Sequence, residues 1–297
     1  MSEPLVELDE RLVTALRSDP RASMISIAKD IGAPRSLVTS RLRQMFDDGE
    51  LRVVAALHPE FSGKNVIAHV SVRTHGPIEP VLEMVSERKD AVFVSVTSGA
   101  HDFIFEARAE THAQLDELLA EVRARPEVAR INSLVYSRVY KGYLEHETLA
   151  PIQIDEVDSE LLRHLELDGR TSWQDLAEEV GLSGSAVRVR VNRLLDAHLA
   201  KIVVVQDRGR LGQVLTSGVG LTLHGSAEDA LPEFGRLPFV EFAVSTIGRF
   251  DAVMTVRATS AGGLHAAFET LRAHPSVHGF ESWTHLKSVK EDPTRRI

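Results

Sequence analysis

Hydrophobic positions in the first fifty residues recur at the three- and four-residue spacing of amphipathic helices. They form three stripes, which predict three short helices: Leu8, Leu12, Val13 and Leu16; Ile25, Ile27, Ala28 and Ile31; Leu37, Val38, Leu42, Met45 and Phe46. Ser23 is typical of an N-cap for the second helix, and Gly32 of its end. A short apolar run at residues 51–57 then favours a small strand or wing.

The pattern then changes to an alternation of strands and helices. We expect strands at 66–72, 92–97, 103–107 and 128–136, and helices at 78–88 and 112–125, which gives the order βαββαβ. Such a unit forms a four-stranded antiparallel sheet with both helices on one face. The other face has to be covered by a second sheet of the chain or by a second chain, so burial implies self-association.

The whole pattern is repeated at a spacing of 149 residues. A repeat this long contains complete domains, which indicates duplication and fusion. The paired residues share their type: Asp9 and Asp158, Leu12 and Leu161, Leu16 and Leu165, Arg21 and Arg170, Ser23 and Ser172, Gly32 and Gly181, Val38 and Val187, Arg41 and Arg190, Gly99 and Gly248, Asp102 and Asp251, Pro126 and Pro275.

The second part therefore predicts the same elements. Helical stripes at 161–165, 176–180 and 187–195, with Ser172 and Ser183 as N-caps, precede an apolar run at 199–205. Strands are expected at 217–223, 240–245, 252–256 and 277–286, and helices at 228–235 and 263–274.

A three-helix unit with a glycine turn before its last helix follows the helix-turn-helix plan. We therefore expect an α+β fold with two winged helix-turn-helix domains and two ferredoxin-like βαββαβ domains, in the order HTH–sheet–HTH–sheet. The expected ranges, in chain order, are 1–57, 64–143, 158–206 and 213–290, and an acidic, proline-containing linker is expected at 144–157.

Composition narrows the functions. The chain has 297 residues and no cysteine, which excludes disulfides, thiolate metal sites and cysteine nucleophiles. A formal net charge of -9 means that nucleic-acid binding needs a local basic patch. No apolar run approaches the roughly 18 residues of a membrane span, and the first residues do not resemble a signal peptide, so we expect a cytoplasmic protein without a membrane partner.

The third helix of each part supplies a basic patch. With Val38 and Leu42 toward the core, Ser36, Ser40 and Arg43 point outward and Thr39 lies near them, whereas Arg41, like its counterpart Arg190, fits an intradomain or a phosphate partner equally well. A basic face on a purely structural helical domain is the alternative. The candidate DNA-binding residues are Arg35, Ser36, Thr39, Ser40, Arg41, Arg43, Ser183, Ser185, Arg188, Arg190, Asn192 and Arg193.

The outward residues of the second helix, which include Arg188, Val189 and Asn192, differ in chemistry from those of the first. In the major groove, an Arg side chain can form two hydrogen bonds with guanine, and an Asn side chain can form two with adenine. If both helices bind together, the preferred DNA site should be less palindromic than the site of a symmetric dimer.

Each part resembles a full-length Lrp/AsnC-type transcriptional regulator. The resemblance rests on motifs at equivalent places: Leu8-Asp9 and Val157-Asp158; Asp168-Gly169-Arg170 with Ser172; Gly181-Leu182-Ser183 with Val187, Arg190, Val191 and Leu194; and the hairpin Gly248-Arg249-Phe250-Asp251. The first part departs from the family pattern with Gly99-Ala100-His101-Asp102, and with Pro34 where the family has Ser.

The resemblance implies a regulator that binds double-stranded promoter DNA and forms a homo-oligomer through its sheet domains, which the family uses to respond to a small molecule, commonly an amino acid. The implied effector-binding residues are Gly248, Arg249, Phe250 and Asp251, with Gly99, His101 and Asp102. A carboxylate such as Asp102 or Asp251 accepts from an ammonium group, and Arg249 with turn amides can hold a carboxylate. Glycine and aspartate that only stabilise a tight turn are the alternative.

Two other functions stay open. Siroheme decarboxylases resemble paired Lrp/AsnC units, but they need clustered His, Tyr and Arg, and strands 92–107 hold one His and no Tyr, while 240–256 hold neither. The other open function is a metabolite-binding module whose three-helix domains contact proteins. No P-loop, dinucleotide motif or catalytic triad spacing appears, and the 13 His residues are scattered, so we expect no enzyme activity, no cofactor and no metal. Trp173 and Trp283 are expected to be packing residues.

Overall fold

The computed structural model describes residues 3–142, 149–206 and 214–292. The chain forms two compact units, and each contains segments from both parts of the sequence. The helical unit combines Met1–His58 with Thr148–Leu211, and the sheet unit combines Pro59–Glu147 with Gly212–Ile297. The four expected domains are thus grouped in pairs of the same type.

The helical unit contains two sets of three helices followed by a strand. The first set is α1 (Glu3–Ser18), α2 (Met24–Asp30), α3 (Arg35–Asp47) and β1 (Leu51–Leu57). The second is α7 (Glu156–Leu167), α8 (Trp173–Val180), α9 (Gly184–Asp196) and β6 (Ala200–Gln206). All the elements predicted for these segments are confirmed.

The predicted helix caps are also confirmed. The Ser23, Ser172 and Ser183 side chains each accept a backbone N–H of the first helical turn, which satisfies a donor that the helix itself leaves free. Pro34 stands at the corresponding position of α3 and makes no such bond. Gly32 and Gly181 have φ values of +63° and +67°, the left-handed conformation that ends a helix.

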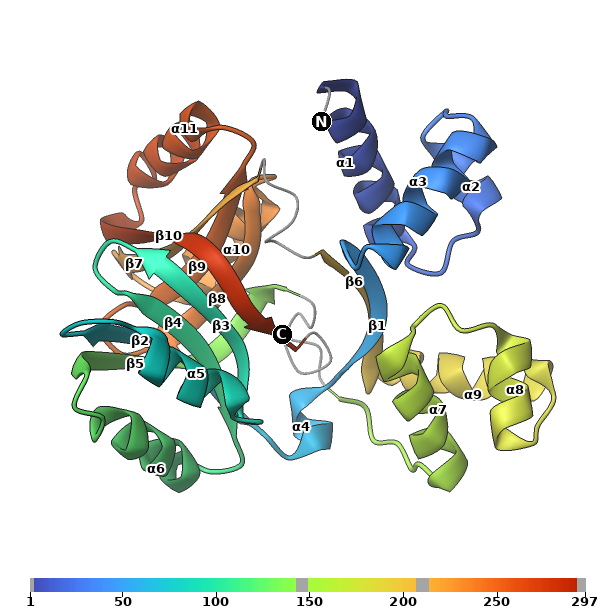
Figure 1. Cartoon of the computed structure of the whole chain (residues 1–297), viewed down its shortest axis with the longest axis horizontal. Coiled ribbons are helices and arrows are strands. Elements are labelled where there is room, and N and C mark those ends of the chain that lie inside the picture. The colour runs from blue at the N-terminus through green and yellow to red at the C-terminus, as the bar shows by residue number, and fades with distance from the viewer. Residues whose placement is uncertain (1–2, 143–148, 207–213, 293–297) are drawn as a thin grey trace. The chain divides into compact units, whose positions relative to one another are not determined.

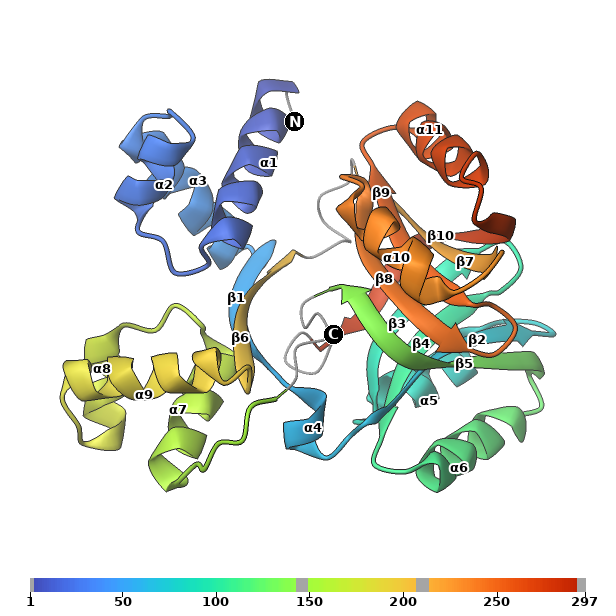
Figure 2. The ribbon, with the colours of Figure 1, turned by 180° about the vertical axis from the view of Figure 1, so that it is seen from behind.

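Two reciprocal contacts relate the halves of the helical unit by an approximate twofold axis. Strands β1 and β6 pair antiparallel, and Val54 faces Val203, which lies 149 residues further along the chain (Figures 1 and 2). The Arg21 guanidinium donates to the carbonyl oxygens of residues 169 and 171, and the Arg170 guanidinium to those of residues 20 and 22. Arg21 also lies 3.8 Å from the centre of the Trp173 ring, so Trp173 packs as expected.

The sheet unit has the predicted βαββαβ order in both of its segments. After the short helix α4 (Pro59–Ser62), the first segment is β2 (Val66–Thr74), α5 (Glu79–Glu87), β3 (Ala91–Ser98), β4 (Phe103–Ala109), α6 (His112–Arg123) and β5 (Val128–Lys141). The second is β7 (Leu215–Leu223), α10 (Ala227–Arg236), β8 (Val240–Ile247), β9 (Ala252–Ala258), α11 (Ala261–Arg272) and β10 (Val277–Glu291).

The two four-stranded sheets join into one closed sheet. The strand order is β10-β3-β4-β2-β5-β8-β9-β7, so the last strand of each segment pairs with the second strand of the other, at β5–β8 and β10–β3. Strands β5 and β10 run past their predicted ends at 136 and 286 because those extensions pair with the other segment. A partner this far along the chain has no local signal in the sequence.

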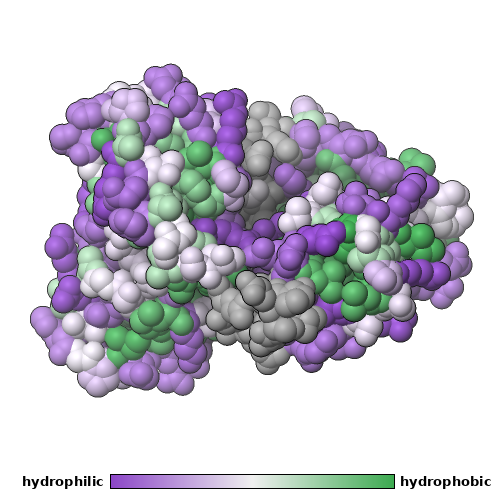
Figure 3. Space-filling model, turned by 90° about the horizontal axis from the view of Figure 1, so that it is seen from above, coloured by the Kyte–Doolittle hydropathy of each residue, from purple (hydrophilic) through white to green (hydrophobic). Residues whose placement is uncertain are grey.

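Closure buries both faces of each sheet. Helices α5 and α6 pack on the outer face of one half and α10 and α11 on the outer face of the other (Figures 1 and 2). The inner faces face each other across the closed sheet. The chain itself therefore covers the inner face of each sheet, as we expected of a second sheet. A homo-oligomer formed through the sheet domains stays a prediction, but burial of these faces no longer requires it. Hydrophilic residues dominate the face seen in Figure 3, with hydrophobic residues in separate patches.

The expected linker needs one correction. Residues 156 and 157 belong to α7, which begins earlier than predicted because the Asp155 side chain accepts from the Asp158 amide and Asp158 accepts in return from the Asp155 amide. The other end of the linker, residues 144–148, and the expected domain limits 143 and 213 lie outside the described residues. Within the described ranges, none of the helices has the length and apolar character needed to span a membrane.

Close packing inside the closed sheet predicts that a substitution of Gly218 lowers the stability of the protein. A Cβ at Gly218 would lie 2.1 Å from Nε1 of Trp283, whose side chain is 2% exposed and cannot move away. We expect Gly218→Ala to lower the free energy of unfolding by about 1–3 kcal/mol. Gly76→Ala, which meets only open space, is the control and should change it by less than about 0.5 kcal/mol. Denaturant unfolding followed by circular dichroism measures both; equal stability of the two variants would contradict the packing described here.

Candidate nucleic-acid interface and hairpin cluster

Helix α3 presents most of the predicted DNA-binding residues to solvent. Arg35, Ser36, Ser40 and Arg43 are exposed, and Thr39 is half-buried beside them. These five residues line one concave surface, which we call the α3 face, together with Gln44, Asp47 and Asp48. The two aspartates reduce the positive charge of this surface toward the end of the helix, which the sequence reasoning did not weigh.

Arg41 does not belong to the α3 face, and its contacts are the intradomain ones that the sequence left open beside a phosphate contact. The Arg41 side chain is 7% exposed, and its Nε and Nη2 donate to the two carboxylate oxygens of Asp9 on α1 at 2.7 and 2.8 Å. Nη2 also donates to Glu50 at 3.1 Å. These hydrogen bonds and charges raise the pKa of Arg41, which stays protonated. A buried guanidinium that holds two helices together cannot reach a phosphate or a base.

Helix α9 presents a second solvent-facing surface. Ser185, Arg188, Val189 and Asn192 are exposed on it, and we call these four residues the α9 face. The exposed fraction of Val189 is 69%, which is unusual for an apolar side chain amid polar neighbours. Ser183 precedes the helix, and its exposed side chain caps α9 by accepting from the Ala186 amide. A DNA contact by Ser183 stays a prediction.

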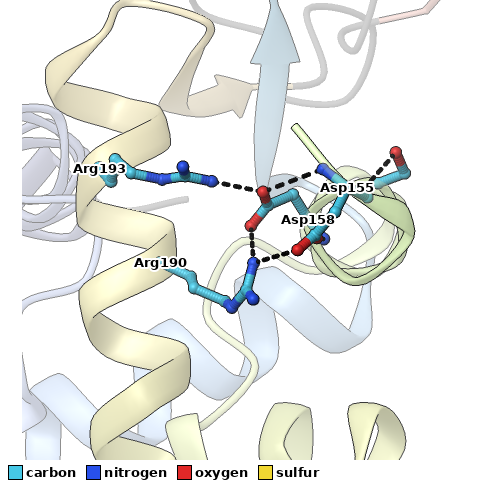
Figure 4. Close-up of polar contacts among 5 residues, drawn as sticks. Asp155, Asp158, Arg190 and Arg193 are labelled. Carbon is cyan, nitrogen blue, oxygen red and sulfur yellow. Dashed lines mark hydrogen bonds and ion pairs between the residues drawn. The ribbon is translucent and has the colours of Figure 1, made fainter. Parts of the chain in front are cut away.

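The other two arginines of α9, Arg190 and Arg193, form hydrogen bonds with aspartates at the start of α7 (Figure 4). Arg190 donates to Asp155 at 2.8 Å and to Asp158 at 2.9 Å, and Arg193 donates to the other oxygen of Asp158. The Asp158 side chain is 1% exposed, whereas Arg190 and Arg193 are 32% and 47% exposed. Arg190 and Arg193 therefore hold α9 against α7, while part of each side chain stays exposed. A phosphate contact by either residue stays a prediction.

The two predicted effector hairpins have equivalent backbone contacts. Gly99 and Gly248 have φ values of +107° and +153°. A Cβ on Gly99 would lie 3.4 Å from the carbonyl oxygen of residue 282, and a Cβ on Gly248 would lie 3.2 Å from that of residue 133 and nearer still to Leu134. Each hairpin thus lies against the last strand of the other segment, and glycine is needed there for the close approach.

The hairpin aspartates serve the turns. Asp102 accepts from the Thr74 amide at 2.7 Å, and Asp251 accepts from the Leu223 amide at 2.8 Å. Phe250 is buried, and its ring fills the space beside Gly220. These contacts support the alternative that the sequence left open, in which the hairpin residues stabilise a tight turn. The residues concerned are Gly99, Asp102, Gly248, Phe250 and Asp251.

Arg249 and His101, one from each hairpin, lie close together, a contact that the sequence did not predict. Arg249 donates to both oxygens of Glu281 on β10, at 3.0 and 2.6 Å, and lies 3.5 Å from Nε2 of His101, which is itself 3.4 Å from Glu281. These three residues form the hairpin cluster. The hydrogen bonds from Arg249 lower the pKa of Glu281, while burial lowers the pKa of His101.

Tilted and edge-on contacts between aromatic rings continue the hairpin cluster into the sheet. The Trp283 ring lies 5.6 Å from the ring of His101 and 5.3 Å from that of His69, which is 6% exposed. Burial, with repulsion from His101 and Arg249, lowers the pKa of His69 to about 3, so His69 is neutral at pH 7. The Trp283 indole N–H finds no hydrogen-bond acceptor among the described residues.

Only one of two equivalent places carries this polar set. The residues 149 positions away have short or apolar side chains or an uncharged amide. They are Gly218 for His69, Phe250 for His101, Ala100 for Arg249, Asn132 for Glu281 and Leu134 for Trp283.

The interior of the closed sheet contains a polar group that was not predicted from the sequence. Glu106, Tyr136 and His285 line a cavity of about 20 Å³ together with His69 and Trp283. The expectation of few His and Tyr residues considered only two strand pairs, whereas β2, β5 and β10 supply these side chains. Polar residues at inward positions of β2 and β4 were the available signal. The cavity has room for about one water molecule.

Comparisons with known proteins identify one helix-turn-helix segment and one sheet segment of the chain. A model of the AsnC-type helix-turn-helix domain matches residues 154–195, and a model of the Lrp/AsnC ligand binding domain matches residues 65–144. An HTH-type transcriptional regulator of Mycobacterium tuberculosis is 31% identical over 140 residues, which cover 46% of this chain and 95% of that protein. The Bkd operon transcriptional regulator of Pseudomonas aeruginosa is 32% identical, over 46% of this chain and 94% of its own length.

The chain belongs to the Lrp/AsnC family of transcriptional regulators. Each of these two relatives corresponds to about half of this Lrp/AsnC chain. The crystal structure of the siroheme decarboxylase NirDL superposes with a TM-score of 0.63 over 95% of this chain and 92% of that chain, at 12% identity. At that identity, the likeness shows a shared fold alone.

His69 predicts a pH dependence of stability. Its folded-state pKa of about 3 lies below the value of about 6.5 in an unfolded chain, so protonation favours the unfolded state as the pH falls from about 6.5 toward 3. In that window His69 should contribute a slope of up to about 1.4 kcal/mol per pH unit, with stability greater at the higher pH. Urea unfolding between pH 7 and 4 should show a shallower slope for His69→Leu than for the wild type. The exposed His112→Leu is the control and should keep the wild-type slope; an unchanged slope in His69→Leu would contradict the prediction.

Proposed function

We propose that this Lrp/AsnC chain is a sequence-specific DNA-binding transcriptional regulator that binds double-stranded promoter DNA through α3 and α9. The observation that carries the proposal is the exposure of both helix faces in one helical unit. Arg43 on the α3 face and Arg188 and Asn192 on the α9 face have side chains that match phosphates or base edges in the major groove. The relatives named as transcriptional regulators support it.

The sheet unit supplies a proposed effector site. We place it at the hairpin cluster, where Arg249 is 35% exposed and can exchange its bond with Glu281 for one with the carboxylate of a small metabolite such as an amino acid. His101 contributes a ring nitrogen beside it. Because Asp102 and Asp251 hold backbone amides, they contribute to the shape of the hairpins rather than to an ammonium contact.

The repeated architecture fits the proposal. A duplication and fusion of a single ancestral regulator explains the spacing of 149 residues and the reciprocal contacts of Arg21 and Arg170. One chain then carries two heads and two sheets, which a symmetric protein would obtain by dimerisation. Further association of such chains, and a place in the cytoplasm, are parts of the same proposal.

The enzyme alternative finds little support in the interior of the closed sheet. His69, Tyr136 and His285 do gather there, but the cavity they line has about 20 Å³, whereas sites for ligands of drug size have about 300–1,000 Å³. A tetrapyrrole is larger than most such ligands and exceeds the volume of the cavity in this structure. A metabolite-binding module without DNA binding has no observation of its own in its favour.

Selection from sheared genomic DNA tests the proposed function. Fragments bound by the full chain are sequenced at one fixed salt concentration, with and without a pool of amino acids, because phosphate contacts make affinity salt-dependent. We expect a defined motif to be enriched, and the enrichment to change with the pool. Absence of any motif under both conditions would reject the DNA-binding proposal.

The effector site has its own test. Arg249→Ala should leave the enriched motif unchanged and abolish the change caused by the amino-acid pool, because it removes the guanidinium that binds the carboxylate. Arg272→Ala, an exposed arginine of α11 paired with Glu269 on its own helix, is the matched control and should respond like the wild type. An Arg249→Ala protein that still responds to the pool would place the effector elsewhere.

A further inference from the structure

The two recognition helices are presented in the same way. Each begins three residues after a left-handed glycine, Gly32 or Gly181, and each is fixed by a buried aspartate of the first helix of its set. Asp9 binds Arg41 and Asp158 binds Arg190, and the two partners are 32 residues apart in both cases. The backbone frameworks that carry the two faces are therefore equivalent.

An approximate twofold axis relates these frameworks. The β1–β6 ladder is centred where Val54 faces Val203, and the Arg21 and Arg170 contacts are reciprocal about the same axis. A symmetric dimer of helix-turn-helix subunits binds two identical half-sites in inverted orientation for this geometric reason. The helical unit has the corresponding arrangement within a single chain.

The exposed faces do not share that symmetry. Arg43 on α3 corresponds to Asn192 on α9, and Ser40 corresponds to Val189. Arg donates two hydrogen bonds to guanine, Asn matches adenine, and an apolar side chain contacts the methyl group of thymine. Thr39 likewise corresponds to Arg188, and among the outward positions Ser36 and Ser185 alone are identical. The same position on the two frameworks thus favours different bases.

We infer that the chain recognises an inverted pair of unlike half-sites and therefore binds its operator in one orientation. The inference rests on the proposed function. The half-site under α3 contains guanine at the position contacted by Arg43. The half-site under α9 contains adenine at the equivalent position, contacted by Asn192, with a thymine whose methyl group meets Val189. A homodimer of identical subunits cannot distinguish the two orientations of a palindrome, whereas this helical unit distinguishes them by its side chains.

The experiment compares three duplexes built from the half-sites that selection identifies. One carries both half-sites as selected, and the others are palindromes of the α3 half-site and of the α9 half-site. Fluorescence anisotropy at fixed salt should show the wild type binding the mixed duplex about tenfold more tightly than either palindrome. Every substituted position is solvent-facing or half-buried, and circular dichroism verifies that each variant is folded.

Exchange of the faces gives the decisive variants. Arg188→Thr/Val189→Ser/Asn192→Arg converts the α9 face to the α3 chemistry and should make the α3 palindrome the tightest duplex. The reciprocal Thr39→Arg/Ser40→Val/Arg43→Asn should favour the α9 palindrome. Arg163→Ala, which removes an exposed charge of α7 outside both faces, is the control and should keep the preference for the mixed duplex.

The outcomes separate this inference from the proposed function. A selected motif that is a true palindrome, or exchange variants that keep the preference of the wild type, would overturn the inference and leave the regulator proposal standing. Failure to select any motif would overturn both. A mixed motif whose halves respond to the exchanges as described would establish both.

Discussion

The structure depends on one constraint, which is that a four-stranded sheet covered by helices on one face leaves its other face bare. The chain meets this constraint with a second sheet of its own, and the last strand of each sheet pairs with the second strand of the other. This closure also removes the open sheet edges that invite aggregation. It brings the hairpin of each segment against the last strand of the other, at Gly99 and Gly248. The hairpin cluster therefore exists because the sheets close on each other.

In the helical unit, ion pairs between helices add to the stability of a small hydrophobic core. A three-helix head has a small core, and in this chain a buried carboxylate on its first helix holds an arginine of its third. Removal of either partner from such a pair leaves a buried charge without compensation, which makes the helix position well defined. Arg41 is buried and contributes nothing to the surface, whereas Arg43, two residues later, faces solvent. The arginines of α3 thus divide between Arg41, which holds the helix, and Arg35 and Arg43, which face solvent.

The amphipathic pattern was sufficient to predict the helices, the βαββαβ order and the serine caps, because these features depend on neighbours within a few residues. It could not predict the extensions of β5 and β10, whose partners lie about a hundred residues or more away, at β8 and β3. The role of Arg41 was undecided for the same reason, since its partner Asp9 is 32 residues distant. A signal was nevertheless present: the pair recurs as Asp158 and Arg190 at the same separation, which is expected of residues in contact. The ring contact between His69 and Trp283 has no such repeat.

Sequence differences between equivalent positions are informative because the backbone around them is the same. At the Asp9 and Asp158 positions the two halves kept the pair that fixes the recognition helix. At the hairpin cluster and on the two recognition helices they did not, and Arg249 stands opposite Ala100 as Asn192 stands opposite Arg43. A homodimer cannot change one of two equivalent sites alone, because any substitution appears in both subunits. A single chain that contains both positions can, so one polar cluster and two unlike helix faces are compatible with a framework that is approximately symmetric.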